Sequence, residues 1–214
     1  MLQIVGYYNK LESILSQSNI FRKGEIKMNE TLKTILTRRS IRKYKEEQIK
    51  EEELQAILEA GKFAPCGLGQ QSSYFTVIQN KEMLQKINKT CKNAYIKSGN
   101  KNFEALAKAE KFSAYHNAPT FIIVSGDQKS SAAYLNNGSV ALENMLLAAE
   151  SLGIGSCWIH SLIIVFPTQE GQALKKELGI PDDYTFVGAA TFGYKDMAQP
   201  SPSPRKEGIV NIIT

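Results

Sequence analysis

The chain has 214 residues, a hydrophobic content of 43%, a charged content of 22% and a formal net charge of +5. These values are near those of soluble globular proteins, and the length fits one domain with a sizeable core. The positive charge is scattered lysine without a long basic tract, so we expect no nucleic-acid partner. No apolar run approaches the roughly 20 residues that cross a bilayer, and the start lacks a signal-peptide pattern, so we expect no membrane partner.

Cysteine and histidine are sparse: Cys66, Cys91, Cys157, His116 and His160. The cysteine count is odd, there is no C-x-x-C, and the histidines lie far from any metal-ligand spacing. We therefore expect neither a disulfide framework nor a metal site. A reducing, cytoplasmic location fits this cysteine usage.

The first 27 residues differ from the rest of the chain. Leu11, Ile14 and Leu15 support one short helix, and "KGEIK" stands directly before Met28. Lys-Gly-Glu can be encoded by a purine-rich stretch that contains a bacterial ribosome-binding sequence, which favours Met28 as the native start. The alternative is a genuine N-terminal helix that packs on the rest of the protein.

The remaining elements are read from their periodicity and end signals. Asn29 or Thr31 caps a helix with Leu32, Ile35 and Leu36 on one face, and a second helix, 49–64, buries Leu54, Ile57 and Leu58 before Pro65 stops it. Strands are predicted at 73–79, 119–126 and 184–194, and 205–214 is a candidate edge strand. Helices are predicted at 81–94, from about Ser131 to Leu152, and at 167–180; 156–161 is a turn or short strand. Residues 95–117 read as short helical pieces in an exposed excursion. This mixture, without a regular strand–helix–strand alternation, indicates an α+β fold.

The stretch "TRRSIRKY" (37–44) carries the strongest charge cluster. Arg38 and Arg42 are four apart and share a face on a helix, with Arg39 one step round and Ser40 adding a hydroxyl. Guanidinium groups match phosphate oxygens two at a time, so the cluster predicts an anion site. The alternative is a helix end at which basic residues complement the helix dipole.

Five segments, taken in order, resemble the nitroreductase family of FMN-dependent oxidoreductases. They are "TRRSIRKY", "ILEAGKFAPCGLGQQSSYFTVI", "ENMLLAAESLGIGSCWI", "LGIPDDYTFVGAATFGY" and "PSPRK". The resemblance runs from about Met28 to the C-terminus, which divides the chain into an N-terminal extension (1–27) and an FMN-binding domain (28–214). It implies a central mixed or antiparallel sheet surrounded by helices, in a homodimer.

The resemblance also implies a cofactor site. The FMN phosphate would be bound by Arg38, Ser40 and Arg42, with Arg39 close by and Arg205 and Lys206 completing the cage. The family segment Pro-Ser-x-x-Asn-x-Gln-Pro-Trp lies against the flavin across the dimer interface. Here it reads "PCGLGQQSS", in which Gln71 is kept while Cys66 and Gly69 replace the Ser and the Asn. Contacts are expected from Pro65, Cys66, Gly67, Leu68 and Gln71, and Cys66 is better explained as a small packed residue than as a nucleophile.

A backbone N–H of Ile159, His160 or Ser161 is expected to point toward the flavin ring. His160 is either a proton donor or a packed or solvent-facing residue, and Trp158 is expected to pack in the core. No side chain is assigned as catalytic.

The implied reaction passes hydride from NADH or NADPH through flavin N5 to a nitroaromatic, a quinone or a similar electron-poor acceptor, by a ping-pong mechanism. The alternatives are a flavin reductase or dehydrogenase for one specific metabolite, or an FMN-binding protein with little turnover. The excursion at 95–117 is expected to act as a flap that influences the choice of oxidant.

Overall fold

The structure is a computed structural model that describes residues 28–129 and 131–214. The interpretations of residues 1–27 lie outside this described part. The chain forms two compact units. The smaller comprises 28–39 together with 199–214, and the larger comprises Ser40–Ala198.

Among its described residues, the smaller unit contains one helix, α3 (Glu30–Thr37). As predicted, Asn29 caps it, because its side chain accepts a hydrogen bond from the Leu32 N–H at 2.9 Å. Gln199 Nε2 donates to the Thr37 carbonyl at 2.5 Å and so ties the returning chain to the end of this helix. The edge strand predicted over 205–214 is wrong for the described structure, in which this segment is irregular. A strand requires a neighbouring strand to pair with, and here the segment pairs with none.

The larger unit is built on one antiparallel sheet with the strand order β1-β2-β4-β3. Its strands are β1 (Ser73–Ile78), β2 (Thr120–Asp127), β3 (Gly155–Ile159) and β4 (Tyr184–Gly193). Three of them fall where strands were predicted, and β3 resolves the predicted turn or short strand in favour of a strand. This arrangement confirms the α+β class with an antiparallel sheet.

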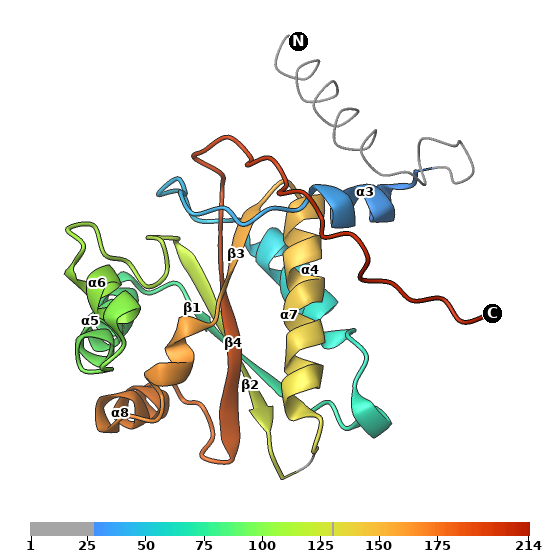
Figure 1. Cartoon of the computed structure of the whole chain (residues 1–214). Coiled ribbons are helices and arrows are strands. Elements are labelled where there is room, and N and C mark those ends of the chain that lie inside the picture. The colour runs from blue at the N-terminus through green and yellow to red at the C-terminus, as the bar shows by residue number, and fades with distance from the viewer. Residues whose placement is uncertain (1–27, 130) are drawn as a thin grey trace. The chain divides into compact units, whose positions relative to one another are not determined.

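Helices cover both faces of the sheet (Figure 1). One face carries α4 (Glu51–Lys62) and α7 (Tyr134–Ser151). The other carries α5 (Lys81–Ile96), α6 (Lys101–Lys108) and α8 (Gln169–Glu177). Two short 3₁₀ helices, η1 (Gly67–Gly69) and η2 (Ser161–Ile164), lie in the connections. No helix among the described residues is long and apolar enough to cross a membrane.

Strand β2 shows how the sequence fills both layers. Phe121 and Ile123 pack into the cluster under α5 and α8, whereas Ile122 and Val124 pack into the cluster under α4 and α7. Alternate side chains of a strand point to opposite faces, so a continuous apolar run is what a strand covered on both faces needs. Each such side chain contributes about 1.5–3 kcal/mol when fully buried.

The excursion at 95–117 is less exposed than its composition predicts. It does contain a helical piece, α6, but Ala107 and Ala114 are buried, and Asn88 on α5 accepts a hydrogen bond from the Ala114 N–H at 2.8 Å. The rings of Phe103 and Phe112 lie 4.9 and 5.6 Å from that of Tyr95. Aromatic packing anchors the segment on α5, and weak periodicity in the sequence concealed these anchors.

Helix α8 provides a test of close packing beside η2. A Cβ atom on Gly171 would lie 2.0 Å from the Val165 carbonyl oxygen. Replacing glycine with alanine inside a helix normally stabilises it by about 1 kcal/mol. We expect Gly171→Ala instead to lower the free energy of unfolding by about 1–3 kcal/mol, because backbone must move. Urea unfolding measures this, and Ala173→Gly on the exposed side of the same helix is the control, which should show only the ordinary propensity loss. A stabilised Gly171→Ala variant would contradict the packing described.

Candidate functional site

The basic cluster begins where α3 ends. Arg38 caps the helix in an extended conformation (φ −51°, ψ 133°), with its N–H bonded to the Thr34 carbonyl at 3.0 Å. The helical face that was predicted to join Arg38 and Arg42 is therefore wrong, because the helix stops at Thr37. Arg39 turns back onto the helix end, where Nη1 donates to the Leu36 carbonyl at 2.9 Å. The alternative role of a basic residue at a helix C-terminus thus applies to Arg39.

The next residues pair with strand β3 of the larger unit. Ser40 forms a parallel bridge with Ser156, and the Ile41 N–H donates to the Ser156 carbonyl at 2.8 Å. Ile41 is completely buried and Arg42 is exposed. Because side chains alternate along an extended segment, Ser40 and Arg42 lie on the side opposite Ile41. A hydroxyl and a guanidinium therefore stand together beside the start of β3.

Tyr44 holds this segment in place. Its hydroxyl donates to the Ile41 carbonyl at 2.5 Å and is hydrogen-bonded to Thr191 Oγ1 on β4 at 2.7 Å. Burial raises the pKa of Tyr44, so the phenol stays neutral and keeps both bonds. The position of Arg42 is thus fixed by a buried tyrosine two residues away.

Arg205 and Lys206 lie in the irregular tail and are exposed. They belong to the same unit as Arg38 and Arg39, whereas Ser40 and Arg42 belong to the other. The assembly of the two groups into one cage stays a prediction.

The loop after α4 has an unusual backbone. Leu68 and Gln71 are non-glycine residues in the left-handed region, with φ of 54° and 48°. The side chain of Leu68 is 95% exposed. Cys66 is half-buried, and its sulfur accepts a hydrogen bond from the Gln71 N–H at 3.4 Å, which makes it a packed residue of the loop. Left-handed conformations of such residues cost free energy and concentrate at functional sites.

The segment 159–161 follows directly from β3. Ile159 is buried in the core and His160 is exposed, its ring 6.3 Å from that of Phe186, so His160 faces solvent in this chain. Ser161 begins η2, and its hydroxyl is hydrogen-bonded to that of Tyr95. Burial raises the pKa of Tyr95 to about 12. Trp158 packs against the α4–α7 cluster, as predicted.

The sequence did not predict the hydrogen bond of Tyr95 to Ser161. Tyr95 lies four residues after Cys91 on the buried face of α5, so the pattern indicates only a core residue. Sequence reasoning also missed His116. This half-buried histidine has a left-handed backbone (φ 54°) near Arg42. Burial, and then the positive charge of Arg42, lower the pKa of His116 below its ordinary 6.5.

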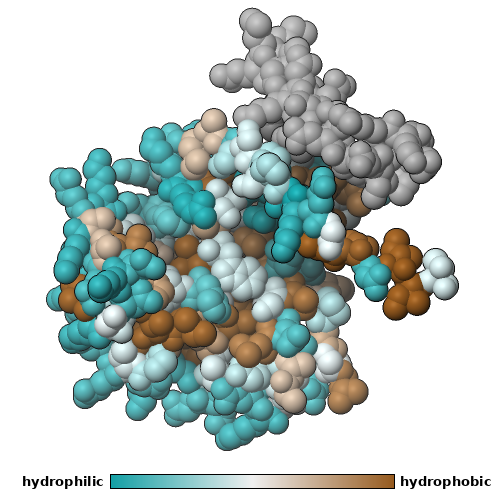
Figure 2. Space-filling view, viewed as in Figure 1, coloured by the Kyte–Doolittle hydropathy of each residue, from teal (hydrophilic) through white to brown (hydrophobic). Residues whose placement is uncertain are grey.

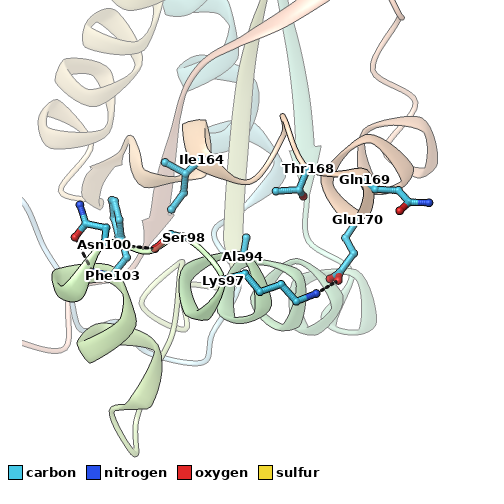
Figure 3. A pocket seen from close by; sticks show the side chains of 9 residues that line it. All are labelled: Ala94, Lys97, Ser98, Asn100, Phe103, Ile164, Thr168, Gln169 and Glu170. Atoms are coloured by element: carbon cyan, nitrogen blue, oxygen red, sulfur yellow. Dashed lines mark hydrogen bonds and ion pairs between the residues drawn. The ribbon is translucent and has the colours of Figure 1, made fainter.

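A cavity of about 490 Å³ lies between α5–α6 and η2–α8 (Figure 3). Phe103 and Ile164 form part of its wall, and an ion pair between Lys97 and Glu170, 2.8 Å long, stands at its side. None of the predicted cofactor-binding residues lines it. Tyr95 links it to the predicted site, since its ring packs on Phe103 and its hydroxyl is hydrogen-bonded to Ser161.

Comparison with known proteins identifies the family. The Nitroreductase family matches residues 35–194. A protein of Archaeoglobus fulgidus, named an NADH dehydrogenase/NAD(P)H nitroreductase, is 36% identical over 172 residues, which are 78% of this chain and 86% of the relative. The chain belongs to the nitroreductase family.

Two solved structures share the fold. The FMN-bound nitroreductase of Bacteroides fragilis has a TM-score of 0.82 and 37% identity, covering 87% of this chain and all of the other. The FMN-bound nitroreductase of Desulfitobacterium hafniense has a TM-score of 0.78 and 28% identity, with the same coverage.

The lowered pKa of His116 gives a pH dependence. At neutral pH this histidine is neutral in both the folded and the unfolded state. As the pH falls below 6.5, the unfolded chain takes up a proton that the folded chain resists, so folding stability is lost. We expect His116→Asn to lose less stability than the wild type between about pH 7.5 and pH 5.5, since asparagine tolerates the left-handed backbone. Urea unfolding at both pH values measures the difference. Equal losses in the two proteins would contradict it.

Proposed function

We propose that the protein is an FMN-dependent oxidoreductase that oxidises NADH or NADPH and reduces an electron-poor acceptor such as a nitroaromatic or a quinone. The observation that carries the proposal is the match to the FMN-bound nitroreductase of Bacteroides fragilis, because it extends over the whole of that chain. The relatives named NAD(P)H nitroreductases support the same class of reaction.

The residues present suit the FMN phosphate. Ser40 and the exposed Arg42 offer a hydroxyl and a guanidinium on one side of a fixed extended segment. Phosphate oxygens take charge-assisted hydrogen bonds from such donors. We assign phosphate binding to these two residues, with Arg38, Arg39, Arg205 and Lys206 from the smaller unit.

The ring of the cofactor would be held by two pieces of backbone. One is the segment Ile159, His160 and Ser161, and the other is the loop with Pro65, Cys66, Gly67, Leu68 and Gln71, contributed by a second copy of the chain. Bound FMN supplies a ring that accepts a hydride at N5 and gives up electrons to a second substrate.

The chain's own part is to bind and orient. Fixed backbone N–H groups and nearby positive charge stabilise negative charge that develops beside them. His160 faces solvent, and we assign it no proton transfer. We expect the nicotinamide and the acceptor to use one place in turn, which gives ping-pong kinetics.

Two measurements test the proposal. The purified protein should be yellow, and it should oxidise NADH or NADPH with a nitroaromatic or quinone acceptor, giving parallel lines in double-reciprocal plots. A yellow protein without such turnover would favour the alternatives, either a specific metabolite as substrate or FMN binding with little activity. A colourless protein that takes up no added FMN would overturn the proposal.

The phosphate assignment predicts the effect of removing single arginines. We expect Arg38→Ala and Arg42→Ala each to weaken FMN binding about tenfold to a hundredfold, because a charge-assisted hydrogen bond contributes roughly 1.5–3 kcal/mol. Fluorescence titration of the flavin-free protein measures this. Lys43→Ala is the matched control, since Lys43 is a basic residue of the same segment whose Nζ lies 2.6 Å from Asp196. Unchanged affinity in both arginine variants would remove the assignment.

We also propose that the protein is a homodimer. The larger unit exposes apolar side chains in and beside the loop that follows α4, and on α7, namely Phe63, Leu68, Leu135 and Val140. Within the smaller unit, the C-terminal end exposes Ile209, Val210, Ile212 and Ile213, drawn brown in Figure 2. Apolar groups that monomers leave exposed in such numbers mark interfaces.

Light scattering at micromolar concentration should give twice the chain's 23.8 kDa. The interface should bury more than about 2,000 Å², as obligate pairs do. Val140→Asp, which places a charge on the exposed side of α7, should weaken the dimer and release FMN. A monomeric wild type that retains FMN would contradict the dimer.

A further inference from the structure

Helix α7 carries one buried polar cluster against its sheet-facing side. Asn137 is only 6% exposed, and its Nδ2 donates to Ser72 Oγ at 3.0 Å and to Ser131 Oγ at 3.3 Å. Its Oδ1 accepts a hydrogen bond from the Gly67 N–H at 3.2 Å. Both serines are buried as well. The Asn137 amide therefore donates to two serines and accepts from a glycine, all three outside helix α7.

Two of these partners are the ends of the cofactor loop, residues 66–72. Gly67 stands at its start and Ser72 at its end, where the Ser72 carbonyl also accepts a hydrogen bond from the Asp127 N–H at 2.9 Å. Asn137 thus spans the loop from α7 and fixes the separation of its two ends.

The loop needs such an anchor because the residues between its packed ends, Cys66 and Ser72, are exposed. Leu68 and Gln71, the loop's two non-glycine residues with left-handed backbones, both have exposed side chains. A left-handed conformation is costly for these residues, and no buried apolar contact of their own side chains compensates for it. Hydrogen bonds at the Gly67 N–H, the Ser72 hydroxyl and the Ser72 carbonyl therefore define the shape of the loop.

We propose that Asn137 is a positioning residue for FMN, acting through the 66–72 loop. The inference rests on the proposed function. Cys66 and Gly69 stand where the family pattern has Ser and Asn, so less of the contact to the flavin can come from loop side chains and more must come from loop backbone. The affinity for the flavin then depends on backbone shape, which the amide of Asn137 maintains from beneath the loop.

Three variants separate this role from general stability. Asn137→Leu keeps the size of the side chain and removes its donor and its acceptor. Asn137→Asp keeps an acceptor for the Gly67 N–H, and the hydroxyls of Ser72 and Ser131 can rotate to donate to it. Asn144→Leu is the matched control on the same helix, because Asn144 donates a single hydrogen bond, 3.0 Å long, to the Ala60 carbonyl in α4, away from the loop.

We expect Asn137→Leu to weaken FMN binding about tenfold, since the loop loses the hydrogen bonds that Asn137 makes to Gly67 and to Ser72. Asn137→Asp should bind FMN within about threefold of the wild type, and Asn144→Leu should bind like the wild type even if it melts at a lower temperature. The visible circular dichroism of bound flavin should change in Asn137→Leu alone. Should Asn137→Leu fail to fold, Asn137→Ser replaces it, because its shorter side chain cannot reach both ends of the loop.

Amide hydrogen exchange in the flavin-free protein supplies a readout independent of the cofactor. Exchange at residues 67–71 should rise in Asn137→Leu and stay at the wild-type level in Asn144→Leu. Wild-type affinity in Asn137→Leu, or equal weakening in Asn144→Leu, would overturn the positioning role. A wild type that binds no FMN would instead overturn the proposed function itself, and the exchange rates would still show whether Asn137 holds the loop.

Discussion

The candidate site of the larger unit depends on main-chain pairing of the segment 40–44, in which Ser40 and Ile41 pair with Ser156 of strand β3 and Tyr44 pairs with Lys195. The Ile41 N–H donates a hydrogen bond to the Ser156 carbonyl at the edge of the sheet. Complete burial of the Ile41 side chain stabilises this position. Strand β3 runs on to Ile159, and Ser161 begins η2 two residues later. The hydroxyl of Ser40, the guanidinium of Arg42 and the backbone of 159–161 are therefore carried by two segments that one main-chain bridge joins, and our proposal assigns the phosphate and the flavin ring to them.

The cofactor loop (66–72) is stabilised in a different way. It projects from α4 with exposed side chains and a strained backbone, and a buried amide on α7 holds its ends. In the proposed homodimer, one flavin would be bound by the sheet-borne segments of one copy and by the loop of the other. In such a division the loop can vary in sequence, as Cys66 and Gly69 illustrate, provided that its backbone keeps its shape.

Most elements were predictable because their signals are local. The apolar run 119–126 predicted β2. The capping residue Asn29 predicted the start of α3, and the acidic residues of its first turn predicted the start of α4. Two of the predictions that failed did so for non-local reasons. The basic cluster was assigned to a helix, but main-chain pairing with Ser156 drew residues 40–41 into an extended segment. Residues 205–214 have the composition of a strand, yet within the described chain they have no strand to pair with.

The sequence by itself determined the family, the α+β class and the residue types suited to a phosphate, because these follow from composition, periodicity and the order of short motifs. Only the tertiary structure decided which groups interact: the hydroxyls of Tyr95 and Ser161, the amide of Asn137 with the Gly67 N–H and the Ser72 hydroxyl, and the charge of Arg42 with His116. Each pair joins positions far apart in the chain. Periodicity reports which side of a helix or strand is buried, but the hydrogen-bonding partner of a buried polar group depends on how distant elements pack against each other.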